Sequence, residues 1–385
     1  MKKEITELRA LMRERDLDVY FVLSGDAHSG EYTASYWRLR AFLSGFTGSA
    51  GTLVVTHEMA GLWTDGRYHI QAAEELKDSG ITLFKAGEKD VPTYQKFIAD
   101  NIKKGGKLGF DGRMTSTAAF NTLKEALRDK EVEYAYHEDI AGTLWKDRPP
   151  LPTEPVFEHE AKFAGISASE KLSKIREKMK ERGYTSYLVS DLTEVAWLLN
   201  LRGRDMTFLP VFYAYVLIME TSATLFIEPS KIKDLASKIT AQGFTIRRYE
   251  EIASAVSNLK DGILYCNSNN TNMLLTEAVP KSVKVQNAPA DDIVRLLKAI
   301  KTPEEISNTR NAYIKESTAI TRLLIWLDIC RANGEICTLK EGDITKKLRE
   351  YRAPEEFYIC DSFSTIPLLK IISSYFMFAK ELAVR

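Results

Sequence analysis

The chain has no excess charge of either sign and no long apolar run. Its 53 lysines and arginines balance 53 aspartates and glutamates over 385 residues, so no overall basic field exists to attract nucleic acid or anionic lipid. No apolar run reaches the roughly 20 residues that a membrane-spanning helix needs. We therefore expect neither nucleic acid nor a membrane as a partner.

Cysteine and histidine are also scarce, and this narrows the possible chemistry. The four cysteines lack Cys-Xaa-Xaa-Cys spacing, which argues against a disulfide framework or a zinc ribbon and fits a reducing compartment. The last of the five histidines is His159, and none shows metal-ligand spacing, so each is expected to be a surface or structural residue. No nucleophile elbow or phosphate loop is present. Because the N-terminal segment reads as a charged amphipathic helix, not a secretory leader, a cytoplasmic location is expected.

What is present is an ordinary globular composition with an internal repeat. With 44% hydrophobic and 28% charged residues, the chain is long enough for two or three domains. An apolar helix stripe precedes a buried strand at Val19–Leu23, and the same pattern recurs before Ser186–Ser190, at an offset of 167 residues. We therefore predict two copies of one α/β unit. The residues that are identical at this offset are Arg9, Met12, Glu14, Arg15, Tyr20 and Val22 in the first copy and Arg176, Met179, Glu181, Arg182, Tyr187 and Val189 in the second.

A cluster of four prolines between Trp145 and Pro155 marks the boundary between the copies. Closely spaced prolines exclude a continuous helix or a central strand, so this stretch is predicted to be a linker. The second copy is expected to contain a strand pair at Val211–Ile218 and Thr224–Ile227. The predicted domains are 1–150, 156–299 and 302–385.

The region between Phe42 and Tyr68 has the densest pattern of the chain. Three glycines punctuate a loop, and two apolar runs, Thr52–Thr56 and Gly61–Thr64, are separated by a polar turn. This pattern predicts a β-hairpin. An Asp-Gly turn then leaves Arg67 just past a strand end, where functional residues are often found. The alternative is a plain hairpin whose arginine is solvated or ion-paired.

A third region opens with Thr302 and Glu305, a capping box with proline at the first helical position. A long helix is predicted from there, followed by a helix at Glu341–Arg352 and a strand at Tyr358–Ile366. We expect the tail, Pro367–Leu382, or a second chain to cover the apolar face of the long helix. The residues predicted to form that face are Ile306, Tyr313, Ile320, Leu323, Leu324 and Leu327.

Several of these segments resemble the Xaa-Pro aminopeptidases (aminopeptidase P) of the prolidase and creatinase superfamily. The order and spacing of the segments agree with that family from Leu8 to about Ile366. The segments are SGFTGSAG, LWTDGRY, LWKDRP at Leu144–Pro149, EVAWLLNLRG at Glu194–Gly203, PVFYAY at Pro210–Tyr215 and KTPEEISNTRNAYIK at Lys301–Lys315.

The resemblance implies an α/β fold of two tandem creatinase-type (RNase H-like) mixed-sheet domains, followed by the opening helices and strand of a pita-bread domain. It implies a homodimer that releases the N-terminal residue of peptides with proline at the second position. In the family two divalent metal ions, with manganese expected, carry the reaction. Arg67 matches an arginine that reaches toward the peptide, where its paired donors could hold a carbonyl or carboxylate group. Trp63, Asp65 and Tyr68 are expected to fix the strand end.

The resemblance ends after Asp361–Ile366. The family continues there into a glycine- and asparagine-containing stretch that ends in a His-Tyr pair, whereas this chain reads PLLKIISSYFMFAKELAVR. The family's metal ligands, two aspartates, one histidine and two glutamates, would follow that point, so this chain is expected to hold no metal ligand and no catalytic residue. Two other hypotheses stay open. The chain could be a non-catalytic peptide- or protein-binding or dimerisation module, or an inactive truncated product.

Overall fold

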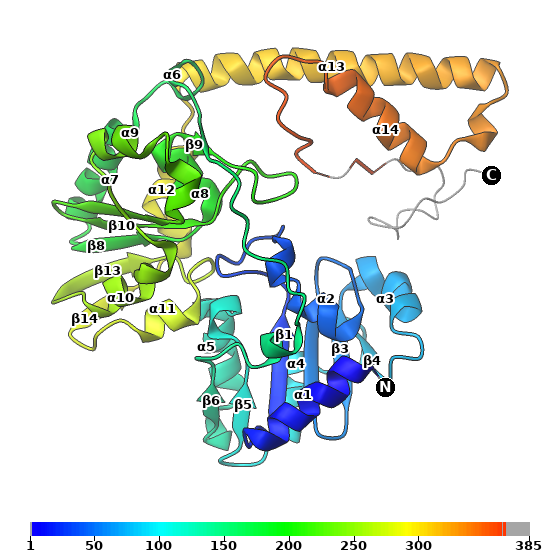
Figure 1. The fold of residues 1–385 in the computed structure, drawn as a ribbon, viewed down its shortest axis with the longest axis vertical. Helices are drawn as coiled ribbons and strands as arrows, with labels where there is room; N and C mark the ends of the chain where they lie inside the picture. The colour runs from blue at the N-terminus through cyan, green and yellow to red at the C-terminus, as the bar shows by residue number, and fades with distance from the viewer. Residues whose placement is uncertain (1, 364, 367–385) are drawn as a thin grey trace.

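The computed structural model describes residues 2–363 and 365–366 of the chain. It shows two six-stranded mixed sheets with flanking helices, followed by a helical segment that starts beside the second unit and runs across the side above the first (Figure 1). The strand orders are β4-β3-β2-β1-β5-β6 and β12-β11-β10-β8-β13-β14. In the first sheet β2 is antiparallel to both of its neighbours, β1 and β3, and in the second sheet β10 is antiparallel to both of its neighbours, β8 and β11. The other three strand pairs of each sheet are parallel. The two sheets therefore have the same topology, and the predicted fold class is confirmed.

The first unit is organised around β1, whose residues are almost all buried. Ile5, Leu8 and Met12 lie on one face of α1 and are completely buried, and burial of each contributes roughly 1.5–3 kcal/mol. The predicted helix, strand and hairpin of this unit are confirmed. Its strands are β1 (Val19–Leu23), β2 (Thr52–Thr56), β3 (Ala60–Thr64), β4 (Thr82–Lys85), β5 (Lys107–Gly109) and β6 (Glu133–Ala135). Its helices are α1 (Lys3–Glu14), α2 (Leu39–Ser44), α3 (His69–Glu75), α4 (Tyr94–Asn101) and α5 (Thr117–Ala126).

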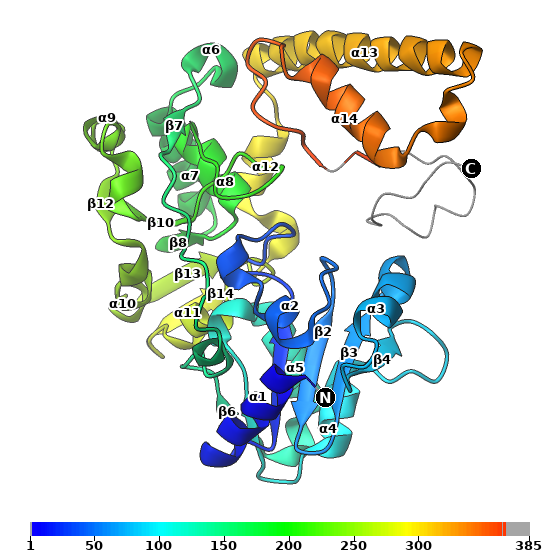
Figure 2. The ribbon, with the colours of Figure 1, turned by 45° about the vertical axis from the view of Figure 1, so that its right-hand side comes forward.

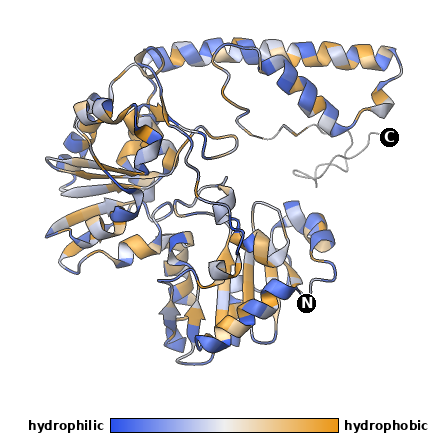
Figure 3. Ribbon diagram, viewed as in Figure 1, coloured by the Kyte–Doolittle hydropathy of each residue, from blue (hydrophilic) through white to orange (hydrophobic). Residues whose placement is uncertain are grey.

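The second unit repeats this plan, with a buried central strand and a covering helix that buries Leu172, Ile175 and Met179. Its sheet strands are β8 (Ser186–Val189), β10 (Ala214–Met219), β11 (Ala223–Ile227), β12 (Thr245–Arg247), β13 (Gly262–Cys266) and β14 (Val283–Gln286), and β7 (Phe157–Glu158) and β9 (Leu201–Arg202) form a separate pair. Its helices are α6 (Ala161–Ala164), α7 (Ala168–Glu181), α8 (Leu192–Leu199), α9 (Ala236–Ala241), α10 (Ile252–Ser257), α11 (Met273–Glu277) and α12 (Ile293–Ala299). Figure 3 shows the apolar residues concentrated on the strands of both sheets.

One pair of residues that are identical in the two units has the same structural role in each. Arg9 on α1 donates from Nε to the carbonyl oxygen of Thr56, the residue paired with Val19. Arg176 on α7 donates in the same way to Met219, the equivalent strand position in the second sheet. In both units the helix is therefore tied to the edge of its sheet by an arginine that satisfies a strand-end carbonyl group.

The proline-rich segment that joins the two units has no regular secondary structure, but its start packs against the first unit. The described chain forms no helix or strand between Leu144 and Phe157, which agrees with the predicted linker. The Trp145 ring nonetheless stacks on Phe42, with centroids 4.8 Å apart. The Arg148 side chain is only 11% exposed, so the start of the linker is packed against the first unit.

One predicted strand starts later than expected, and another prediction of a strand is wrong. The strand predicted at Val211–Ile218 begins only at Ala214, because the backbone N–H of Tyr213 donates to the Asp205 carboxylate instead of to a strand. The strand predicted at Tyr358–Ile366 is absent from the described residues of that segment. There the Asp361 carboxylate pairs with two arginines of the preceding helix, and no neighbouring strand offers a hydrogen-bonding edge.

The helical segment contains α13 (Pro303–Ala332) and α14 (Glu341–Arg352), and both match the predicted helices. The predicted capping box is present, with Thr302 Oγ1 accepting from the Glu305 N–H at 3.1 Å. The apolar face predicted for α13 is only partly covered in the described residues. Leu323 packs against α14, whereas Tyr313 and Leu324 are exposed, because the shorter α14 covers only part of the longer helix. The tail predicted to cover that face, 367–385, lies outside the described residues. None of the described helices is long and apolar enough to cross a membrane.

Candidate functional site

Three loops with polar residues meet at one edge of the first sheet. Strands β3, β1 and β5 run in the same direction, so their carboxyl ends lie at the same edge. Asp65-Gly66-Arg67 follows β3, Asp26 to His28 follow β1, and Asp111-Gly112-Arg113 follow β5. In Figures 1 and 2 this edge is turned toward the side on which α13 and α14 lie. Because ligands of α/β sheets usually bind at the carboxyl ends of strands, this edge is the candidate site.

Arg67, the residue selected from the sequence, is held here by Asp65. One carboxylate oxygen of Asp65 accepts from the backbone N–H of Arg67 at 3.1 Å and from its Nε at 2.8 Å. The other oxygen accepts from Nη2 at 2.9 Å. These hydrogen bonds hold the pKa of the Asp65 carboxyl below its usual range and raise the pKa of the guanidinium. Among the described residues none accepts from Nη1, and the Arg67 side chain is 43% exposed.

A second Asp-Gly-Arg sequence forms the same turn in a buried setting. Asp111 accepts from the backbone N–H, Nε and Nη2 of Arg113, as Asp65 does from Arg67. Here Nη2 also donates to Asp139 at 3.0 Å, and the guanidinium lies over the Trp37 ring. Arg113 Nε and Nη2 are therefore engaged inside the protein, while its side chain is 35% exposed and, among the described residues, none accepts from its Nη1 either. The Asp-Gly-Arg tripeptide, which follows both β3 and β5, is a signal present in the sequence that the sequence prediction did not use.

The neighbours of Arg67 that the contacts name are acidic and aromatic residues of the first unit. Tyr68 is buried and its hydroxyl lies 2.7 Å from Ser49 Oγ, which fixes the base of the turn. The charge of Glu31 also acts on Arg67 and on Tyr32, whose hydroxyl pKa is raised mainly by desolvation. The Tyr32 ring contacts the edge of Phe208 from the second unit, with centroids 5.4 Å apart. The candidate site thus has acidic and aromatic neighbours around one exposed guanidinium.

The loop after β1 also forms hydrogen bonds that join the two units. The buried Asp26 carboxylate accepts from the backbone N–H of His28 at 2.9 Å and from the hydroxyl of Tyr213 at 2.9 Å. The His28 ring reaches into the second unit, where Nδ1 lies 2.7 Å from the carbonyl oxygen of Ser190 and Nε2 lies 2.9 Å from the Tyr249 hydroxyl. His28 is therefore a structural residue, as expected, but its place between the units could not be read from the sequence.

Two family models, both described as Creatinase/Prolidase N-terminal domain, match residues 5–139 and 147–305. Proteins named probable Xaa-Pro aminopeptidase P from Pyrenophora teres f. teres and Neurospora crassa are each 36% identical to the chain, over 377 and 378 residues, or 94% of it. The chain belongs to the Xaa-Pro aminopeptidase P family. It spans 57% and 54% of the lengths of these two relatives.

The fold agrees with a solved member of the Xaa-Pro aminopeptidase family. The X-prolyl aminopeptidase of Caenorhabditis elegans matches 94% of this chain and 61% of its own chain, with a TM-score of 0.87 and 28% sequence identity. That protein is described as a cytosolic enzyme with a di-nuclear active site. Over the described residues of the present chain, no group of three or more His, Cys, Asp or Glu side chains could hold a metal ion. The described residues therefore do not fit such a centre.

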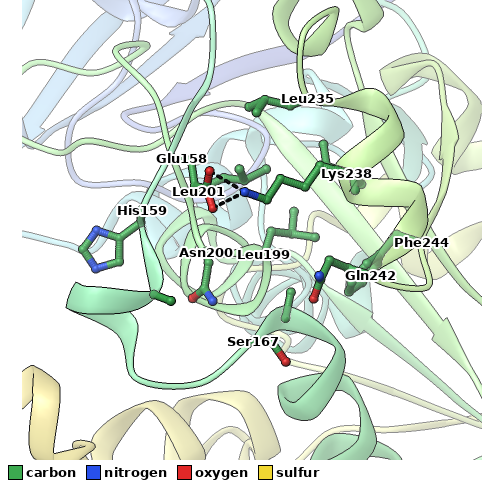
Figure 4. Close-up of a pocket in the computed structure, with 13 residues that line it drawn as sticks. Glu158, His159, Ser167, Leu199, Asn200, Leu201, Leu235, Lys238, Gln242 and Phe244 are labelled. Carbon is green, nitrogen blue, oxygen red and sulfur yellow. Dashed lines mark hydrogen bonds and ion pairs between the residues drawn. The ribbon is translucent and has the colours of Figure 1, made fainter.

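A cavity of about 230 Å³ lies in the second unit of this family member, apart from the Arg67 edge (Figure 4). Its lining is mostly apolar, and its charged groups have partners within the chain. Lys238 pairs with Glu158 at 2.6 Å, and the Asn200 side chain bonds both Lys171 and the carbonyl oxygen of Ile166. The His159 ring, which also lines the cavity, stacks on Phe163 with centroids 5.4 Å apart. With its charges already paired, this cavity is a weaker candidate than the Arg67 edge.

Proposed function

We propose that this chain forms the substrate-side part of an Xaa-Pro aminopeptidase, which releases the N-terminal residue of peptides that carry proline at the second position. The agreement with family members over 94% of the chain supports this proposal. The enzyme would act as a homodimer in the cytoplasm, with two divalent cations, manganese being the expected metal, held by residues other than those described here. The proposed domains remain 1–150, 156–299 and 302–385.

The observation that carries the proposal is the hydrogen bonding and the exposure of the Arg67 side chain. Its guanidinium is fixed on one side by Asp65 and exposes the Nη1 edge at the carboxyl end of the sheet. A charged N–H group donating to a peptide carbonyl or carboxylate oxygen forms a stronger hydrogen bond than a neutral pair. Arg67 would therefore hold and orient the peptide, while the bond-breaking chemistry belongs to the metal centre.

Substitution of Arg67 tests this role. Titration of the purified chain with the peptide Arg-Pro-Pro, followed by calorimetry or NMR, should give saturable binding. Arg67→Lys should weaken that binding roughly tenfold, because a lysine keeps the charge but cannot donate in a planar fork. Arg128→Lys is the control, since Arg128 is also exposed and also pairs with nearby carboxylates, those of Glu125 and Asp129. Equal affinities for the wild type and Arg67→Lys would overturn the proposal.

A further inference from the structure

The two Asp-Gly-Arg turns allow an internal comparison. Each begins with an aspartate that caps a single helical turn and binds the Nε and Nη2 atoms of the arginine two residues later. The tripeptide therefore encodes a local arrangement in which the arginine side chain is folded back on its own aspartate. Local geometry is the same in both copies, so any difference in role must come from the surroundings.

The surroundings of the two turns differ sharply. The Asp111 side chain is 4% exposed, whereas the Asp65 side chain is 42% exposed. A Cβ atom added at Gly112 would lie 2.9 Å from Met273 Sδ, but one added at Gly66 would meet nothing within 4 Å. The second turn is therefore packed into the protein, while the first borders open space beside the Arg67 guanidinium.

An exposed ion pair such as Asp65–Arg67 contributes little to folding stability. The pair does restrict the arginine side chain, whose rotamer freedom would otherwise be lost when a ligand immobilises it. A ligand that binds an already ordered guanidinium does not have to order it again, and its affinity rises for that reason. An exposed pair with little structural value is thus well suited to prepare a binding residue.

We propose that Asp65 is a positioning residue for the substrate. It holds the Arg67 guanidinium by Nε and Nη2 and leaves the Nη1 edge directed at a peptide oxygen. The inference rests on the proposed function, because it assigns to Asp65 a role that is exerted only through Arg67. The equivalent pair, Asp111 with Arg113, has a purely structural role in the same fold.

The test compares Asp65→Asn with Asp111→Asn in the full chain. Asparagine still caps the turn but loses the charged two-point contact with arginine, so the local fold is retained. We expect Asp65→Asn to weaken Arg-Pro-Pro binding roughly five- to tenfold without a measurable fall in Tm. Asp111→Asn should lower Tm and leave the affinity unchanged, and Asp65→Glu should recover part of the lost affinity.

A spectroscopic readout separates positioning from a general structural effect. In a chain labelled with ¹⁵N-arginine, the Nε–Hε signal of Arg67 is identified by its loss in Arg67→Lys. In the wild type this proton should exchange slowly with water, and in Asp65→Asn it should exchange faster. If Asp65→Asn keeps the wild-type affinity and exchange while Arg67→Lys weakens binding, the role of Asp65 is overturned and the proposed function stands. If Arg67→Lys binds like the wild type, the proposed function itself fails.

Discussion

His28 lies where the two sheet-containing units meet, and its ring is completely enclosed. Nδ1 faces the carbonyl oxygen of Ser190 and must therefore carry the proton, which leaves Nε2 to accept from the Tyr249 hydroxyl. The ring also stacks on Tyr215, with centroids 4.1 Å apart. Burial lowers the pKa of His28, although the nearby Asp26 carboxylate opposes this effect. The interface thus contains a neutral histidine.

The free energy of unfolding should depend on pH through His28. An unfolded histidine titrates near pH 6.5, and the pKa of His28 is lower in the folded chain, so the unfolded state binds more protons as the pH falls. The contribution of neutral His28 to the free energy of unfolding is fully present above about pH 6.5 and decreases as the pH falls below that value. Urea unfolding between about pH 5 and 8 should therefore show falling stability at the acidic end, and His28→Gln should remove this contribution.

Two comparisons make the His28 measurement specific. Burial raises the pKa of Glu194 to about 8, which gives the opposite slope, so the informative quantity is the difference between wild type and His28→Gln. His57→Gln, at an exposed histidine, should leave the pH profile unchanged. Parallel pH profiles for the wild type and His28→Gln would contradict the prediction.

At the level of elements, the features that sequence predicted are those with local causes. The hairpin at Thr52–Thr64 and the start of α13 at Pro303 follow from alternation, turn residues and a capping box. Three other features depend on contacts that the sequence does not show. They are the packing of the linker, the hydrogen bonds of His28 to the second unit and the absence of a strand near Tyr358 in the described residues. Arg67 could be selected because it follows a strand, and the family resemblance names Asp65 as fixing that strand end, but the two-point contact of Asp65 with Arg67 and the matching Asp111–Arg113 pair could not be read from the sequence.

The linker should contribute to stability through Arg148. This side chain shares Asp139 with Arg113, donates from Nε to the carbonyl oxygen of Tyr36 at 2.8 Å, and lies 3.8 Å from the centre of the Tyr36 ring. Arg148→Ala should lower the free energy of unfolding by roughly 2–3 kcal/mol, since Asp139 keeps one of its two arginines. Denaturant unfolding measures the loss, and limited proteolysis should show earlier cleavage between Trp145 and Phe157.

A neighbouring lysine provides the control for the linker. Lys146 is exposed, so Lys146→Ala should change neither the unfolding free energy nor the cleavage pattern. If Arg148→Ala is as stable as Lys146→Ala, the segment is only a connection and the packing of Arg148 has no energetic role.

At the level of the whole molecule, the chain has two unequal bodies. One core cluster contains buried residues from both sheet-containing units, and each unit has a further cluster made almost entirely of its own residues. By contrast, α13 and α14 share a small separate core of Ala319, Leu323, Ile344 and Leu348. The bodies meet near α6, where the Asn308 side chain donates to the carbonyl oxygen of Lys162 at 2.8 Å. We therefore expect the two units to unfold together and α13–α14 to contribute little to that transition.

The exposed apolar residues of α13 should make the chain self-associate. Tyr313, Ile314, Leu324 and Ile325 are each more than half exposed on this helix, and exposed apolar surface favours association. Shortening the chain after Ala299 should keep the melt of the two units, because α12 buries Ile293 and Val294 and is retained. It should also reduce association in light scattering.

A pair of substitutions in the full chain distinguishes the apolar face from the rest of the segment. Leu324→Lys should reduce association about as much as the shortened chain does, since it places a charge within the apolar surface. Ala312→Lys adds the same charge at an exposed position on the opposite side of α13 from Ile314 and Ile325, and it should change association less. Loss of the cooperative melt in the shortened chain would show instead that α13 and α14 belong to the core of the two units, and unchanged association would show that another surface joins the chains.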